Sequence, residues 1–254
     1  MNYLRGLILP LIVALPLLAF AGTPSADEAI TKARAYVGKE RDINGLRSIH
    51  YLAHMEVRDS TGALVKTASG PMELILQKPD QQLVVRTLGQ LRDTVGLDGL
   101  TGWQRTESVG EPKKGRTTIL PRAQLRQTQA NAFENLSFFR GLEQRGGRVE
   151  MRGETTIEGR PAIRIAFIHP GELVFLRSFD RETGRLLLSE GQDGERSREE
   201  GECVVQGIRF PKRVISTGRS VDGKMMVTTL FFDEIKVNEV FPPSTFAVPM
   251  VSPH

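Results

Sequence analysis

The feature that most constrains the fold is a series of strand-like segments between Ile49 and Trp103. Each segment is rich in β-branched, aromatic or aliphatic residues, and each ends in residues that favour a tight turn. The predicted strands are Ile49–Arg58, Ala63–Leu76, Leu83–Leu88, Leu91–Leu97 and Thr101–Thr106. The turns between them are Asp59-Ser60-Thr61-Gly62, Lys78-Pro79-Asp80, Gly89-Gln90 and Asp98-Gly99. Turns this short join neighbouring strands in antiparallel order, so the segment predicts an antiparallel sheet without obvious catalytic apparatus.

A second set of strands is predicted in the rest of the chain. They are Arg148–Ile157, Pro161–Ile168, Leu173–Asp180, Arg185–Gln192, Cys203–Gln206, Arg209–Gly218 and Lys224–Val237. Some of these strands carry apolar residues on both faces; for example, Ile163, Ile165 and Phe167 alternate with Ala162, Ala166 and Ile168. A sheet that is apolar on both faces must be covered on both sides or must enclose something.

Two helices are predicted beside these strands. The first spans about Asp27 to Lys39, and Ser25 with Glu28 forms a capping-box pattern at its start. The second spans about Arg122 to Gln144 and has a broad apolar surface. Two interpretations explain this surface: the helix is buried deeply against the sheet, or it forms a lid over an apolar hollow. Because two helices cannot cover about ten strands, we predict a mainly β, strongly curved sheet with the helices on its concave side.

The N-terminal residues are typical of a cleaved secretory signal peptide. Arg5 gives a positive start, an apolar stretch runs from Leu7 to Phe20, and Ala19-Phe20-Ala21 offers small residues for cleavage before Gly22. We therefore expect residues 1–21 to be removed, residues 22–254 to form a single domain, and the protein to be exported. No cysteine lies near the cleavage site to carry a lipid anchor, and Cys203 has no second cysteine to pair with.

The sequence offers little chemistry for an enzyme. His50 and His54 lie four residues apart on a predicted strand, about 13 Å from each other, which is too far for one metal ion. No nucleophile elbow, metalloprotease, paired-cysteine or phosphate-binding motif is present. The net charge of +4 comes from interspersed residues, which argues against nucleic-acid binding. We therefore expect a binding protein without a catalytic residue, metal or cofactor. The alternative is a hydrolase that uses a pair of carboxylates, which only the distance between the two carboxyl groups could exclude.

Several short motifs along the chain are distinctive. In the first half they are Ser48-Ile49-His50, Gly70–Pro79 and Leu97–Trp103. In the second half they are Gly159-Arg160-Pro161, Phe179–Gly184, Phe232–Asn238, Phe241-Pro242 and Phe246–Pro249. Together these motifs resemble the LolA/LolB-like superfamily of outer-membrane lipoprotein-sorting proteins. Where the carrier of that family has an Arg-Pro pair, this chain has Lys78-Pro79.

The resemblance implies an open, unclosed antiparallel β-barrel of about ten or eleven strands, with helices covering its concave apolar face. It also implies a monomeric periplasmic carrier that shields acyl chains of a lipid or lipoprotein and exchanges them with acceptor proteins in the inner or outer membrane. Burying one methylene contributes about 0.8 kcal/mol, so a long acyl chain supplies on the order of 12 kcal/mol without covalent chemistry.

The ligand-binding residues that we predict on this basis are Leu74, Leu76, Lys78, Val85, Trp103, Leu136, Phe139, Ile165, Phe167 and Phe231. Ordinary core packing is the competing interpretation for each apolar side chain among them. An alternative function from another class is an envelope-sensing or scaffold module of the same fold, which would act through protein contacts.

Overall fold

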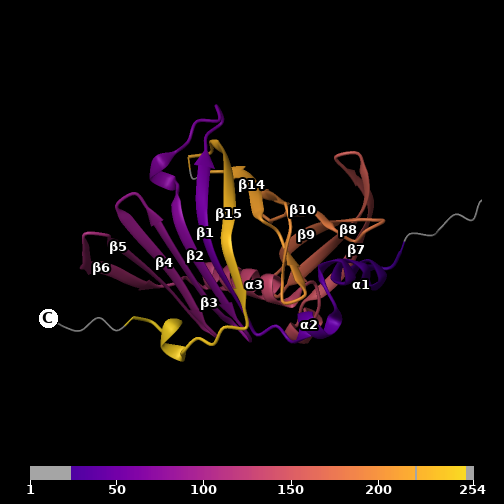
Figure 1. The fold of residues 1–254 in the computed structure, drawn as a ribbon, viewed down its shortest axis with the longest axis horizontal. Helices are drawn as coiled ribbons and strands as arrows, with labels where there is room; N and C mark the ends of the chain where they lie inside the picture. Colours follow the sequence, from indigo (N-terminus) through magenta and orange to yellow (C-terminus); the bar gives the residue numbers. More distant parts are fainter. Residues whose placement is uncertain (1–23, 221, 250–254) are drawn as a thin grey trace, which may run out of the picture.

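The computed structural model describes residues 24–220 and 222–249, and the predicted signal peptide lies outside these residues. Thirteen strands of the described part form one antiparallel sheet, in the spatial order β6-β5-β4-β3-β2-β1-β15-β14-β11-β10-β9-β8-β7 (Figure 1). From first to seventh, the strands are β1 (Ser48–Arg58), β2 (Gly70–Gln77), β3 (Gln81–Leu88), β4 (Leu91–Asp98), β5 (Thr101–Ser108), β6 (Glu111–Ile119) and β7 (Arg148–Ile157). The next are β8 (Arg160–His169), β9 (Leu173–Asp180), β10 (Leu186–Glu190), β11 (Arg196–Glu200), β14 (Arg213–Arg219) and β15 (Met225–Val237). A separate hairpin pairs β12 (Cys203–Val205) with β13 (Ile208–Phe210).

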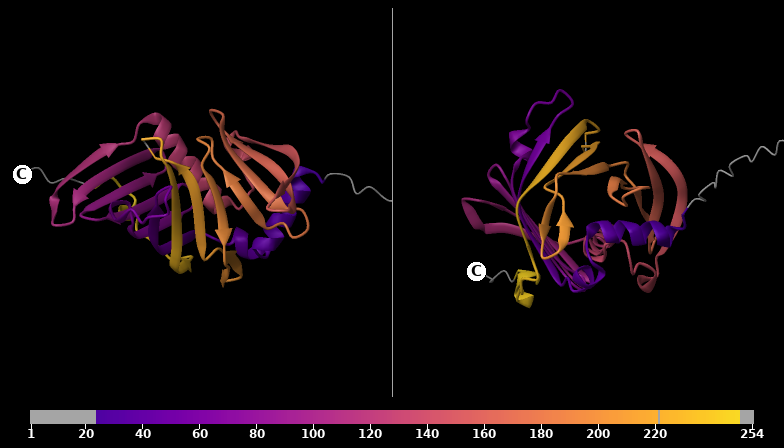
Figure 2. Two further views of the ribbon diagram at one scale, coloured as in Figure 1. Left: turned by 90° about the horizontal axis from the view of Figure 1, so that it is seen from above. Right: turned by 45° about the vertical axis from the view of Figure 1, so that its right-hand side comes forward.

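The sheet is curved and does not close on itself. Its edge strands β6 and β7 stand at opposite ends of the strand order, and the chain's last strand, β15, pairs with its first, β1 (Figures 1 and 2). We call β1–β6 the first wing and β7–β11 the second wing; β14 and β15 join them. The predicted mainly β, open half-barrel architecture is therefore confirmed.

Three α-helices accompany the sheet in the described part of the chain. They are α1 (Ala26–Val37), α2 (Glu40–Asn44) and α3 (Arg122–Ser137); short 3-10 turns occur at Lys66–Ala68, Glu143–Arg145 and Pro243–Thr245. The three α-helices lie together at the hollow side of the sheet (Figures 1 and 2). None of them combines the length and hydrophobicity that crossing a membrane requires.

The capping box predicted at the start of α1 is confirmed. The Ser25 hydroxyl accepts a hydrogen bond from the Glu28 backbone N–H at 3.2 Å, and the Glu28 carboxylate accepts one from the Ser25 N–H at 2.7 Å. In contrast, α3 ends at Ser137, well before the predicted end at Gln144. It stops because Phe138 and Phe139 both have positive φ angles, of 46° and 72°, which a right-handed helix cannot include.

The described residues contain fifteen strands, more than the twelve segments predicted from the sequence and the ten or eleven strands that the resemblance implies. The missed strands β6 and β11 are dominated by charged and polar residues, so no apolar alternation marks them. The predicted strand Arg209–Gly218 is split into β13 and β14 around Pro211, since proline cannot donate a ladder hydrogen bond. The predicted strand Ala63–Leu76 begins only at Gly70.

The concave side of the sheet holds two apolar clusters beneath the helices. One joins α1 to the second wing and includes Ala33, Ile165, Phe167 and Phe179. The other joins α3 to the first wing and the β12–β13 hairpin, and it includes Leu76, Leu97, Ala132, Leu136 and Phe210. The two clusters thus fill part of the space between the helices and the two wings of the sheet.

The C-terminal segment covers part of the convex side. The Trp103 indole N–H donates a 2.8 Å hydrogen bond to the carbonyl of Phe246, whose side chain is fully buried. Gly96 is opposite Trp103 on the neighbouring strand, and a Cβ there would lie 2.2 Å from the indole ring, so glycine is required. His50 lies between the carboxylates of Glu73 and Glu239, at 2.9 and 2.6 Å, and links the same segment to the sheet.

Candidate functional site

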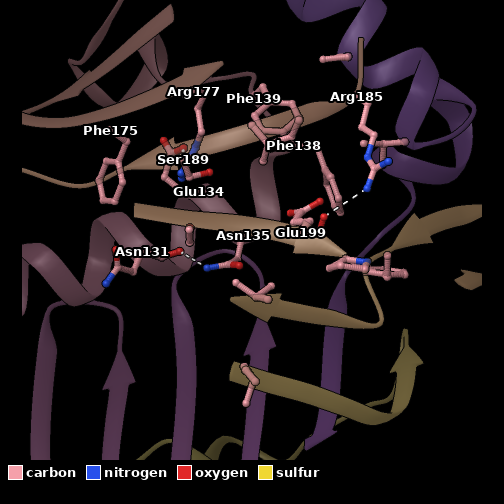
Figure 3. A pocket seen from close by; sticks show the side chains of 18 of the residues that line it. Asn131, Glu134, Asn135, Phe138, Phe139, Phe175, Arg177, Arg185, Ser189 and Glu199 are labelled. Atoms are coloured by element: carbon pink, nitrogen blue, oxygen red, sulfur yellow. Dashed lines mark hydrogen bonds and ion pairs between the residues drawn. The ribbon is translucent and has the colours of Figure 1, made fainter. Parts of the chain in front are cut away.

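A cavity of about 840 Å³ lies between the concave face of the sheet and the helices α1 and α3. Its size falls in the range of about 300–1,000 Å³ that is usual for small-molecule sites. The wall combines apolar and charged side chains, and Figure 3 shows ten labelled ones around the hollow. The apolar part is made by Val37, Tyr51, Leu74, Phe138, Phe139, Phe175, Leu186, Phe210, Val214, Leu230 and Phe232.

Two adjacent phenylalanines reach the cavity from a strained turn after α3. Phe138 has a left-handed backbone (φ 46°, ψ 56°) and Phe139 also has a positive φ, a conformation that costs free energy for residues other than glycine. The buried guanidinium of Arg34 from α1 stabilises this turn by donating to the carbonyls of Ser137 and Phe138, at 3.0 and 2.8 Å. It also forms a two-pronged ion pair with Glu40, with both bonds at 2.7 Å. Helix α1 therefore determines where the two aromatic side chains stand.

A buried charged network forms another part of the wall. Glu134 of α3 accepts a hydrogen bond from His169 Nε2 at 2.8 Å and pairs with Arg177 Nη2 of β9 at 3.3 Å. The carboxylate only accepts hydrogen bonds, so the His169 Nε2 carries the proton. The Arg177 guanidinium also lies over the Phe175 ring, 5.4 Å from its centroid. The network joins α3 to the second wing and brings Glu134 and Arg177 to the cavity.

Glu199 of β11 is the most perturbed carboxyl in this wall. Burial raises the pKa of Glu199 to about 7; nearby Glu202 acts in the same direction, and Arg177 and Arg185 oppose the shift. Arg185 donates a 3.2 Å hydrogen bond to the backbone carbonyl of Glu199, not to its carboxyl group (Figure 3). The same wall is near Tyr51, whose pKa is raised by burial and secondarily by the charge of Glu199. The cavity thus contains a carboxyl that changes charge near neutral pH.

The structure distributes the ten predicted ligand-binding residues over four locations. Leu74 and Phe139 line the cavity. Leu76, Leu136, Ile165 and Phe167 are buried in the two apolar clusters beside it. Lys78 is exposed in the β2–β3 turn, and Val85, Trp103 and Phe231 lie on the convex face.

The three convex residues are identified by their neighbours. Val85 pairs with Glu73, which contacts His50 on the outer side. Phe231 stacks on the His54 ring at 4.8 Å, while the adjacent Phe232 faces the cavity and packs on Tyr51. A bulge in the β1–β15 pairing, between Leu52 and Ala53, reverses the faces of β15, so Ile235 and Phe232 both point inward.

Sequence reasoning did not select most of the cavity wall. Phe138, Phe175, Arg177, Ser189 and Glu199 were all missed. One signal was available, because Phe175 and Arg177 share a face of β9 by the two-residue period, and a charge on an apolar face marks a polar site. Among the described residues, no cluster of three or more metal-ligand side chains is present.

The fold is similar to that of two solved structures. A LolA superfamily protein from Nitrosomonas europaea matches with a TM-score of 0.58 and 15% sequence identity, over 90% of this chain and 99% of the other. A DUF1329 family protein from Desulfovibrio piger matches with a TM-score of 0.56 and 10% identity, over 87% of this chain and 96% of the other. No protein-family model and no curated protein matches the sequence. The chain therefore has a LolA-like fold, as the sequence motifs indicated.

Proposed function

We propose that the protein is a periplasmic carrier that shields the acyl chains of a lipid or lipoprotein in its concave cavity. The observation that carries this proposal is the apolar part of the wall, where aromatic side chains from the turn after α3, from β9 and from β15 face one hollow of about 840 Å³. Transfer of an acyl chain from water to such a wall contributes about 0.8 kcal/mol per methylene. The function needs burial and release, not bond making.

The strained turn at Phe138 and Phe139 supports the same proposal. Backbone strain persists where the surrounding structure enforces it, and such positions cluster at binding sites. Here Arg34 holds the turn so that two aromatic rings stand at the cavity. The Phe139 ring contacts Phe167 and Phe179 at its other side, with centroids 6.1 and 4.9 Å apart, so its position is well defined.

The proposal is tested by native mass spectrometry of protein purified gently from the cell envelope, together with titration of a fluorescent fatty-acid probe. Copurified lipid or lipoprotein and saturable probe binding are expected. A protein that emerges without ligand and captures no acyl probe would contradict the carrier function. A specific protein partner found in that case would favour the envelope-sensing alternative.

Export and domain organisation form part of the proposal. We propose that residues 22–254 act as one exported unit after cleavage before Gly22. N-terminal sequencing of the protein recovered from the periplasm should begin at Gly22. Recovery of the intact N-terminus from the membrane fraction would argue for an anchored form instead.

A further inference from the structure

The cavity wall contains a row of polar side chains within its second wing. Arg177, Ser189 and Ser197 come from β9, β10 and β11 and are direct register partners across the three strands. All three residues line the cavity. Since neighbouring strands are about 4.8 Å apart, the row extends over roughly 10 Å.

Two polar groups of this row have no hydrogen-bond partner among the described residues. Ser189 is only 8% exposed, yet its hydroxyl has no hydrogen-bond partner there. The Nε of Arg177 is also buried without a partner in the same part of the chain. Buried polar groups normally have partners. The Arg177 Nε has no accessible surface, but Ser189 lines the cavity, so a ligand there can supply the partner that its hydroxyl lacks.

The Glu199 carboxyl continues the row along β11, two residues after Ser197 and so about 6–7 Å farther along the strand. It has neither a hydrogen bond nor an ion pair with any described residue. The ionisable groups that act on it are Arg177 from β9, Arg185 before β10 and Glu202 after β11; Tyr51 from β1 lies on the facing side. A partly buried carboxylate with no partner is costly unless a cation or a donor reaches it.

The charges of the wall favour a cation over an anion. Five acidic side chains line the cavity, against three arginines. Two of these arginines are already occupied, Arg177 by Glu134 and Arg209 by Glu202. An anionic head group would compete with those carboxylates and meet the charge of Glu199, whereas a protonated amine would find Glu199 unpaired.

We propose that the cavity selects amphiphiles whose head group carries a protonated amine. The amine binds the Glu199 carboxylate, and an oxygen atom between amine and acyl chain accepts a hydrogen bond from the Ser189 hydroxyl. The acyl chain lies against the aromatic wall, so this inference rests on the proposed acyl-binding function. Two sources share this chemistry: an aminophospholipid, and the free amino terminus of a lipidated polypeptide.

The test compares probes with the same twelve-carbon chain and different head groups. Dodecylamine, dodecanoate and dodecyl maltoside are titrated below their micelle concentrations at about pH 8, where the amine is protonated. Dodecylamine should bind at least about tenfold more tightly than dodecanoate. The Glu199→Gln variant should lose this preference and keep its affinity for the neutral maltoside.

Glu200→Gln is the matched control. Glu200 is the next residue of β11 and has the same charge, but it points away from the cavity and pairs with Arg213. This variant should bind all three probes as the wild type does. Equal binding of amine and carboxylate by the wild type, or a preference that survives Glu199→Gln, would overturn the inference and leave acyl binding intact. Failure of all three probes to bind would reject acyl binding itself, and the inference with it.

A second comparison identifies the source of the amine. Lysophosphatidylethanolamine and a synthetic lipidated dipeptide are each compared with their N-acetylated forms, which keep the chain and remove the charge. Tighter binding of the free amine in either pair supports the inference and names the source. No preference in both pairs contradicts it.

Discussion

The two wings of the sheet differ in what they contribute. The first wing contains the series of strands and three of the family-like motifs, including the longest, Gly70–Pro79, yet only Tyr51 and Leu74 of its described residues line the cavity. The second wing contributes Phe175, Arg177, Leu186, Ser189, Ser197 and Glu199. The more recognisable half of the sheet is therefore the less involved in the candidate site.

The difference has a physical cause in how the helices cover each wing. Helix α3 lies directly on the concave face of the first wing, where a Cβ on Gly102 would come within 2.9 Å of the Leu125 side chain. That contact fills the space with packed core. In the second wing, α1 covers Ile165 and Phe167 but leaves the polar row on β9 to β11 uncovered. The packed core under α3 and the polar part of the cavity wall thus occupy separate parts of one sheet.

The largest expected effect comes from Arg34, which connects α1 to the cavity turn. Arg34→Met removes the donors to the carbonyls of Ser137 and Phe138, and leaving such groups unpaired should lower the free energy of unfolding by about 3 kcal/mol. The affinity for an acyl probe should fall as well. Chemical denaturation and probe titration measure the two effects. Arg41→Met, at a largely exposed arginine, is the control and should change neither.

The next effect separates the convex side of the first wing from the cavity. Trp103→Phe keeps an aromatic ring but leaves the buried Phe246 carbonyl without its donor, which should cost about 2 kcal/mol of stability. Acyl-probe affinity should stay at the wild-type level. Reduced affinity in a fully folded variant would show that the first wing takes part in binding from its outer face. That result would contradict the conclusion that this wing is the less involved in the site.

A pair of substitutions sharpens the contrast between the two faces of the first wing. Leu74→Trp adds volume inside the cavity and should weaken probe binding about tenfold, or about 1.4 kcal/mol. Val85→Trp adds the same ring on the next strand but on the convex face, and should leave binding unchanged. Titration of both variants with one fatty-acid probe gives the answer. An equal loss of affinity in the two variants would contradict the assignment of Leu74 to the concave face and Val85 to the convex face.

The smallest effect concerns pH and Glu199 in the second wing. Its pKa rises from an ordinary value of 4.5 to about 7 on folding, so the folded state binds more protons than the unfolded state between these values. Stability should therefore fall as pH rises through this window. Glu199→Gln cannot ionise and should be more stable than wild type at pH 8, by on the order of 1 kcal/mol, but not at pH 4. Denaturation curves at the two pH values check this; a gain that is equal at both would refute the assignment.

Much of the fold was predictable because local rules determine it. The capping box at Ser25 and the strands from β3 to β5 and β7 to β9 occur close to their predicted positions. The site was less predictable, since the two-residue period separates the faces of a strand without saying which one is concave. Val85 and Trp103 were assigned to the pocket on that basis and lie outside it. For Phe231, a single bulge in β15 reversed the expected face.

The sequence by itself determined an antiparallel, mainly β chain with a capped first helix and a LolA-like order of motifs. These properties depend on residues close together in the chain, where turn chemistry and alternation act directly. Only the tertiary structure decided which side chains meet in the hollow. The reason is that Arg34, the Phe138–Phe139 turn, Arg177 and Glu199 come from distant segments, and their proximity follows from the curvature of the sheet and the placement of α1 and α3.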